Sequence, residues 1–227
     1  MRFARLTATL TLLAASLAGS AASAADWASY RDTYRSMVVF EKYGGPKNLL
    51  QNLLQVAPTG GDAEGLDLTL TGKATNLKLA LDPLGRTVFP LLKAAYDENA
   101  VLQVSRKDLN FTLRPRVSIN VRPDGVYDYT ELRAACEQAL GFARYIDSSA
   151  RSRQCAGVRF VFEKKGIPAV RMRKADGTVA PLAVVNGPAF DGDTEGAFPT
   201  VTYRFAGAER SQVSTISAPV AIAPLFE

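Results

Sequence analysis

Hydrophobic positions near the start of this chain recur at helical spacing. Between Asp26 and Val38 the apolar and aromatic positions are Trp27, Tyr30, Tyr34, Met37 and Val38. This spacing is typical of one face of a helix, and the turn Gly44-Gly45-Pro46 would end it. A second apolar stripe follows, formed by Leu49, Leu50, Leu53 and Leu54. We therefore predict a helical N-terminal segment over residues 25–60, containing two helices.

From Leu66 onward apolar and polar residues alternate, which is the period of a strand with one buried face. The clearest alternation covers residues 110–122. Its apolar parity comprises Phe111, Leu113, Val117, Ile119 and Val121, and Arg114, Arg116 and Arg122 lie on the other parity. One apolar and one polar face favour an antiparallel sheet with a solvated side. Similar alternation follows residue 156, so we expect two β-rich halves, over 61–126 and 156–227.

A helical period returns between the two β-rich stretches, over residues 127–155. Asp128 is a suitable N-cap, and Glu131, three residues later, completes a capping-box pattern. The apolar face of this helix comprises Leu132, Ala135, Cys136, Ala139, Leu140, Ala143 and Ile146. Cys155 closes the following loop, and two cysteines in an exported chain favour a disulfide. We predict an amphipathic helix and a connector closed by a Cys136–Cys155 bond.

The two β-rich halves share an order of features. Leu77–Leu79, Thr87–Leu91 and Ala95–Asp97 are echoed by Val170–Met172, Thr178–Leu182 and Ala189–Asp191, and Pro115–Ile119 by Pro219–Ile222. Either two duplicated β units flank the central helix, or the strands form one larger sandwich with a helix on its side. Both interpretations predict a mainly β fold of antiparallel, sandwich-like sheets. The alternative fold class is a single α+β domain.

The N-terminus predicts export. Arg2 and Arg5 precede the apolar stretch Leu6–Leu17, and Ala22-Ser23-Ala24 matches the small-residue pattern of signal-peptide cleavage. We predict a Sec-type signal over residues 1–24, cleaved near Ala24, and a bacterial protein that is periplasmic or secreted. No later apolar run approaches the length needed to span a bilayer, so the mature chain should have no transmembrane segment.

The chain has no histidine, which excludes catalytic triads and metal sites that depend on imidazole. No glycine-rich phosphate loop or dinucleotide fingerprint follows a strand, so we predict no cofactor. These absences favour a non-catalytic accessory or binding protein of the cell envelope. The alternative is an enzyme, a carboxylate-based hydrolase acting on an extracytoplasmic glycan.

Positive charge gathers in the middle of the chain, where residues 101–175 carry 15 basic and 7 acidic side chains. If their strands are neighbours, one basic face would bring together Arg114, Arg116, Arg122, Arg159, Arg171 and Arg173. Such a face would suit an anionic envelope polymer, or another envelope protein, better than nucleic acid. The alternative interpretation is that outward arginines only keep the strands from aggregating.

One acidic loop, Asp191 to Gly196, resembles the first half of a calcium-binding loop. Its candidate oxygen ligands are Asp191, Asp193 and Glu195. The EF-hand pattern then fails, because the twelfth position is Thr202 rather than Glu. A solvated hairpin loop is therefore the favoured interpretation, and no metal site is predicted.

Overall fold

The computed structural model describes residues 27–59, 63–106, 110–193, 196–205 and 210–227. The chain begins with β1 (Trp27–Ser29), α1 (Tyr30–Lys42), β2 (Leu50–Pro58), β3 (Leu68–Thr71), β4 (Asn76–Leu79), β5 (Arg86–Thr87), α2 (Lys93–Asp97), β6 (Val101–Val104) and β7 (Phe111–Ile119). It continues with β8 (Val126–Asp128), α3 (Tyr129–Ile146), the 3-10 helix η1 (Ser148–Ser152), β9 (Cys155–Val161), β10 (Val170–Arg173), β11 (Val179–Pro181), β12 (Val184–Gly187), β13 (Phe198–Arg204), β14 (Gln212–Thr215) and β15 (Ala221–Phe226). The predicted signal peptide, residues 1–24, lies outside the described residues.

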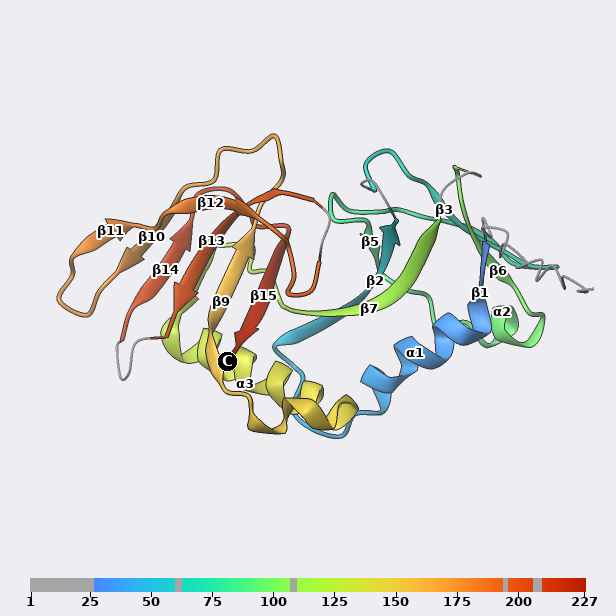
Figure 1. The fold of residues 1–227 in the computed structure, drawn as a ribbon, viewed down its shortest axis with the longest axis horizontal. Coiled ribbons are helices and arrows are strands. Elements are labelled where there is room, and N and C mark those ends of the chain that lie inside the picture. The colour runs from blue at the N-terminus through green and yellow to red at the C-terminus, as the bar shows by residue number, and fades with distance from the viewer. Residues whose placement is uncertain (1–26, 60–62, 107–109, 194–195, 206–209) are drawn as a thin grey trace, which may run out of the picture.

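The described strands form three sheets in which every pairing is antiparallel. The central sheet has the order β12-β13-β9-β15-β7-β2-β5. The first small sheet has the order β1-β6-β3-β4, and the second has the order β11-β10-β14-β8. Figure 1 shows the small sheets at opposite ends of an elongated molecule, with α1 and α3 along one side of the central strands. The predicted fold class, mainly β with antiparallel sheets, is confirmed.

The sheet connections repeat about the middle of the central sheet. In both halves of the chain a short strand of a small sheet, β1 or β8, leads through a helix into a central strand, β2 or β9. The partners of β1 and β8 are β6 and β14, followed in their sheets by β3 and β10 and then by β4 and β11. The last strands, β7 and β15, pair with each other, with Ile119 opposite Ile222.

This repeat corrects the alignment expected between the halves. The similarity of Pro115–Ile119 and Pro219–Ile222 falls on β7 and β15, which do occupy equivalent positions. The similarity of Leu77–Leu79 and Val170–Met172 instead sets β4 against β10, although the strand equivalent to β10 is β3. Strands with alternating apolar and polar residues resemble each other whatever their place in a sheet. The sequence similarity therefore matched β10 to β4, the strand after its structural equivalent β3.

The predicted second helix of the N-terminal segment is wrong, because its leucines lie in or beside β2. β2 pairs with β7 along its whole length, from Leu50 opposite Ile119 to Pro58 opposite Phe111. Leu50, Leu54 and Val56 are buried and share one face of the strand. Four leucines at this spacing fit a helix or a strand, and the long partner strand β7 decides between them. The helix of the predicted segment 25–60 is therefore α1 alone.

The N-termini of α1 and α3 are capped differently. Ser29 caps α1, and its hydroxyl accepts a hydrogen bond from Asp32 N at 3.3 Å. Asp128 is the N-cap residue of α3, as predicted, but its side chain makes no capping bond. It accepts instead from Gln212 Nε2 at 3.1 Å, and Glu131 accepts from Arg122. The predicted capping box does not form, because both carboxylates are used to hold α3 to its neighbours.

The inner face of the central sheet is the side covered by the helices, and two apolar cores lie there. One joins α1, β2 and the first small sheet through Tyr30, Met37, Leu54, Leu68, Leu70 and Leu102. The other joins α3, β9, β15 and the second small sheet through Leu132, Ala139, Phe160, Val213 and Ile222. The sulfur atoms of Cys136 and Cys155 lie at disulfide distance, with 6.0 Å between their Cα atoms. The predicted pairing thus links α3 to the start of β9.

Among the described residues, no helix combines the length and apolar character needed to cross a membrane.

Candidate functional site

The outer face of the central sheet, opposite the helices, carries a row of polar side chains. Gln55 on β2 lies between Arg86 on β5 and Arg114 on β7 in the strand register. Residues directly opposite each other in an antiparallel sheet point to the same face, so this register gathers the three side chains. Arg116, two residues along β7, points the same way. We call Arg86, Arg114 and Arg116 the arginine cluster.

Arg86 is the most deeply buried member of the cluster. Its side chain is 1% exposed and forms an ion pair with Asp82 at 2.8 Å. Its Nη2 also donates to the Val220 carbonyl oxygen at 2.6 Å, and its Nη1 donates to Ser118 Oγ at 3.4 Å. Asp82 is fixed within the turn that precedes β5, because its Oδ1 accepts hydrogen bonds from Leu84 N and Arg86 N. A buried charge requires such partners, and Arg86 has them.

Arg114 and Arg116 share two acceptors. Both donate through Nη2 to Oδ1 of Asp193, Arg114 at 2.8 Å. Both also donate through Nε to Oε1 of Gln55, at 3.3 Å and 2.6 Å. Gln55 itself is anchored by a bond from its Nε2 to the Leu84 carbonyl oxygen. One carboxylate and one amide therefore fix the orientation of two guanidinium groups.

Burial and like charges act on Arg116. Its burial is the largest cause that lowers the pKa of its guanidinium, Asp193 opposes that shift, and Arg114 and Arg86 add to it. The ring of Phe190 covers the cluster, with its centroid 4.9 Å from Arg116 Cζ and 5.6 Å from Arg86 Cζ. Phe190 belongs to an apolar group on the outer face with Leu84, Val161, Ala189, Phe198 and Ala221. The cluster is thus shielded on one side by an aromatic ring.

A pocket of about 530 Å³ opens beside the cluster, and we call it the junction pocket. Segments from both halves of the chain line it, at residues 55–59, 63–66, 81–84, 112–114, 163–165 and 189–198 with gaps. Its charged lining residues are Glu64, Asp82, Arg114, Glu163, Lys164, Lys165 and Asp193. Lys165 and Glu64, from opposite halves of the chain, form an exposed ion pair at 3.2 Å.

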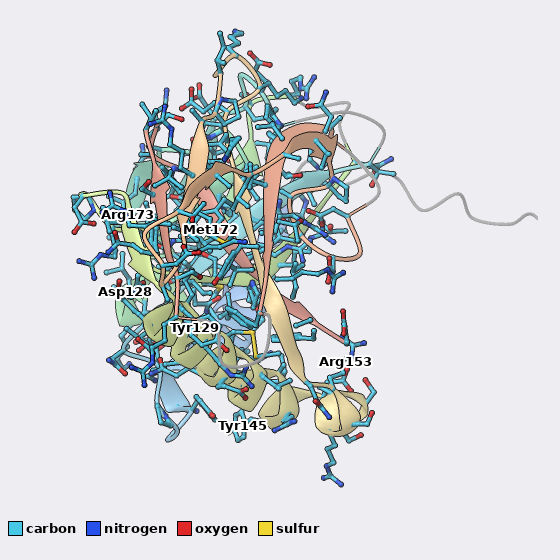
Figure 2. All side chains as sticks on the ribbon, turned by 90° about the vertical axis from the view of Figure 1, so that its left-hand side faces the viewer. Asp128, Tyr129, Tyr145, Arg153, Met172 and Arg173 are labelled. Carbon is cyan, nitrogen blue, oxygen red and sulfur yellow. A yellow bond between two sulfur atoms is a disulfide. The ribbon has the colours of Figure 1, made fainter. Side chains whose placement is uncertain are left out.

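The six arginines of the predicted basic face lie in separate places. Arg114 and Arg116 meet at Asp193, and Arg159 pairs with Asp191 at 3.2 Å on the same outer face. Arg122 pairs with Asp124 and with Glu131 of α3. The remaining two, Arg171 and Arg173, are exposed on the second small sheet, where Figure 2 shows Arg173 above Asp128. The six therefore do not share one face, because Arg122 lies between β7 and β8 and the strand of Arg171 and Arg173 belongs to another sheet.

Arg122 also shifts the titration of its neighbour. Hydrogen bonds from Arg122 and from Val126 N lower the pKa of Asp124 from its ordinary 3.8 to about 2. Reciprocally, Asp124 and Glu131 raise the pKa of Arg122. This network anchors the turn before β8 to the start of α3.

The described carboxylates of the acidic loop form ion pairs with arginines. Asp191 faces Arg159 and Asp193 faces Arg114 and Arg116, while Glu195 lies outside the described residues. Within the described part of the chain, no group of three or more His, Cys, Asp or Glu side chains is placed to bind a metal ion. Carboxylates neutralised by guanidinium groups are poor ligands for a hard cation, which needs their full negative charge. The loop instead fastens the second half of the chain onto β7.

Arg86, Gln55 and Phe190 belong to the site although no sequence pattern indicated them. Arg86 follows a turn and Phe190 lies in a loop, where alternation says nothing about direction. Only the register of β5, β2 and β7 brings the polar row together. An arginine directly after the glycine of a turn carries no mark in a single sequence that it will be buried.

No family model matches this chain, and comparisons with curated proteins and with solved structures gave no significant match.

Proposed function

We propose that the protein is an exported, non-catalytic binding protein of the bacterial cell envelope that holds its ligand in the junction pocket. The observation that carries this proposal is the pocket itself. It measures about 530 Å³, which is within the range of pockets that hold small ligands, and both halves of the chain contribute its walls. The arginine cluster supplies a few oriented polar groups at one wall, as specific binding requires.

Most carboxylates of the pocket are engaged in ion pairs, which suits a structural role better than acid catalysis. A general acid must be free to donate its proton to the substrate. Asp82 forms an ion pair with Arg86, and Asp193 forms ion pairs with Arg114 and Arg116. Glu64 faces Lys165. Of the four carboxylates in the described lining, only Glu163 has no ion pair among the described residues, so the pocket offers one free carboxylate rather than the two that glycan hydrolysis uses. We therefore favour binding over the alternative, a carboxylate-based glycan hydrolase.

The N-terminal sequence and the cysteine pair support an extracytoplasmic location. Residues 1–24 match a Sec-type signal, and a Cys136–Cys155 bond would persist in an oxidising compartment. In such a compartment, accessible ligands include acidic glycans, the phosphates of lipopolysaccharide, and other envelope proteins. Edman sequencing or mass spectrometry of the exported protein should find a new N-terminus near Ala25.

A thermal-shift experiment tests the binding function. The mature protein is heated with a panel of acidic and neutral oligosaccharides, together with two variants. Thr112→Trp fills the pocket from an exposed position on β7, and Thr178→Trp places the same ring in a distant exposed turn. At least one panel member should stabilise the wild type and Thr178→Trp, but not Thr112→Trp.

Two results would contradict the proposal. Equal stabilisation of both tryptophan variants would mean that the ligand binds outside the junction pocket. Cleavage of a stabilising oligosaccharide, detected by chromatography of the same samples, would favour the glycan hydrolase.

A further inference from the structure

We propose that Arg114 is the anion-binding residue of the junction pocket and that it recognises a carboxylate or phosphate group of the ligand. This inference rests on the proposed function and names the chemical class of the ligand. Three positive groups of the arginine cluster face two carboxylates, Asp82 and Asp193. Counted over the described residues, the cluster therefore has one more positive charge than it has carboxylate partners, and a singly charged anionic group would balance it.

Arg114 is the member of the cluster that a ligand can reach. Its side chain is 40% exposed, whereas that of Arg116 is 15% exposed and that of Arg86 is 1% exposed. Arg114 also lines the pocket, which neither of the other two does. Its Nε and Nη2 donate to Gln55 and Asp193, while its Nη1 has no hydrogen-bond partner among the described residues. An anionic oxygen in the pocket can accept from that nitrogen.

The orientation of this guanidinium exists before any ligand binds. Gln55 and Asp193 hold two of its three nitrogens, and Asp193 is itself only 7% exposed. A held group loses little conformational entropy on binding, so its hydrogen bonds contribute more to affinity. Asp193 and Gln55 are positioning residues in this site. The fork shape of arginine, with Nη1 left over, suits a planar carboxylate or a phosphate face.

The other basic side chains, whether beside the pocket or on the second small sheet, are less suited to this role. Lys165 already pairs with Glu64, and Lys164 lies over the ring of Phe198 at 5.1 Å. Arg171 and Arg173 are exposed on an open strand of the second small sheet. Exposed charges of that kind are screened by salt, while a group at a partly enclosed pocket wall is screened less. Among the described members of the arginine cluster, Arg114 is the one that combines access from the pocket with a fixed orientation, and it belongs to a cluster with an excess of positive charge.

The test follows the arginine Nε–Hε signals of the ¹⁵N-labelled mature protein by nuclear magnetic resonance. Inorganic phosphate and acetate are titrated separately at constant ionic strength, with chloride as the balancing ion. The Arg114 signal, assigned with Arg114→Lys, should shift saturably, and the anion that saturates at the lower concentration identifies the preferred ligand group. Arg171 and Arg173 should shift weakly and without saturation.

Matched variants separate Arg114 from general charge. Arg114→Gln, in which binding is followed by the signal of the neighbouring Arg116, should weaken phosphate binding by about tenfold, the loss expected for one charge-assisted hydrogen bond. Arg171→Gln removes an exposed arginine of the same charge and should leave binding unchanged. Thr112→Trp keeps the cluster but fills the pocket, and it should abolish the saturable shift of the Arg114 signal, which preserves the test if Arg114→Gln does not fold.

The outcomes distinguish this inference from the proposed function. An Arg114 signal that does not saturate, or that shifts in parallel with Arg171, would overturn the anion site. A panel oligosaccharide that stabilises Arg114→Gln as well as the wild type would also overturn it, while the binding function would stand. Saturation at Arg114 with no oligosaccharide bound would support the anion site and count against an envelope glycan as the ligand.

Discussion

Arg86 shows how a single charged side chain can be buried at the junction of the two halves. Its guanidinium reaches Asp82, Ser118 and the Val220 carbonyl oxygen, so it links β5 to the segment that precedes β15. These acceptors lie in different directions, and a planar group with five N–H donors can serve them together. A lysine at this position would present one point charge and could not reproduce the fork.

Replacing Arg86 with lysine should therefore destabilise the protein by about 3 kcal/mol, because acceptors in a buried site lose their donors. Urea unfolding followed by circular dichroism measures the change. The control is Arg35→Lys, since Arg35 pairs with Asp32 at 3.0 Å on the exposed surface of α1 and should show little effect. A loss for Arg86→Lys no larger than that of the control would refute the structural role of the fork.

Asp124 offers a test through pH. Its pKa is about 2 in the folded protein, below its ordinary 3.8, because Arg122 and Val126 N bond its charged form. A group with a depressed folded pKa stabilises the protein above its unfolded pKa, and that contribution disappears as the pH falls toward the folded pKa. The stability due to Asp124 should be complete above pH 3.8 and lost on approaching pH 2.

The measurement compares urea unfolding of the wild type with that of Asp124→Asn from pH 6 to pH 2. Above pH 3.8 the wild type should have a higher free energy of unfolding than Asp124→Asn, and this difference should shrink toward pH 2. Arg122→Gln should reduce the same pH-dependent difference, because it removes the main partner. A constant difference across the whole range would show that Asp124 does not titrate as the geometry implies.

At the scale of elements, α3 is a core helix of the second half and also contacts the first. Its buried face packs against β7, β9 and β15, and Gln138 on its other side accepts a hydrogen bond from Leu49 N at 3.0 Å. Cys136, fully buried on α3, is paired with Cys155 at the start of β9. Figure 2 shows a yellow disulfide bond close to this helix. A disulfide here would restrict the conformations of residues 136–155 in the unfolded chain, where packing no longer restricts them.

Removing the bond with Cys136→Ala and Cys155→Ala together should lower the free energy of unfolding by about 3 kcal/mol, the loop-entropy value for a closed loop of this size. Chemical denaturation of the oxidised wild type and of the double variant measures it. Reduced wild type should resemble the variant, which serves as the control. Alkylation of both cysteines in unreduced, folded protein would show that the bond is absent.

At the scale of the molecule, one sheet runs through both halves. β7 of the first half and β15 of the second pair with each other in the central sheet. On the outer face, ion pairs of Arg114 and Arg116 with Asp193 also connect the two halves. Arg86 and Gln138 make further links across the junction. A structure with a shared sheet, shared side-chain networks and a pocket between its halves should unfold as a unit.

We therefore expect one cooperative thermal transition rather than two. Trp27, the single tryptophan, lies in β1 and reports on the first half, while far-UV circular dichroism reports on all strands. The two signals should have coincident midpoints, and the calorimetric and van't Hoff enthalpies should agree. Arg86→Lys should lower the midpoint without separating the signals. Two resolved transitions would show that the halves fold independently.

Local patterns were sufficient where a segment's own side chains settle its conformation. The helix of α1, the stripe of α3 with Asp128 before it, and the alternation along β7 all follow from spacing. Spacing was insufficient at β2, whose leucines fit two periods until β7 pairs with them. It was also insufficient for the capping box, because Gln212 and Arg122, distant in sequence from the expected cap, bind Asp128 and Glu131.

The sequence by itself determined the mainly β composition, the central amphipathic helix, the Cys136–Cys155 pairing and the outward direction of Arg114 and Arg116. Each of these depends on periodicity or on residue type, which a chain carries locally. Only the tertiary structure decided that Arg86, Gln55 and Asp193 meet those arginines, and that Arg122, Arg171 and Arg173 lie away from them. Strand register and loop placement bring these residues together, and both arise from contacts between segments far apart in the chain.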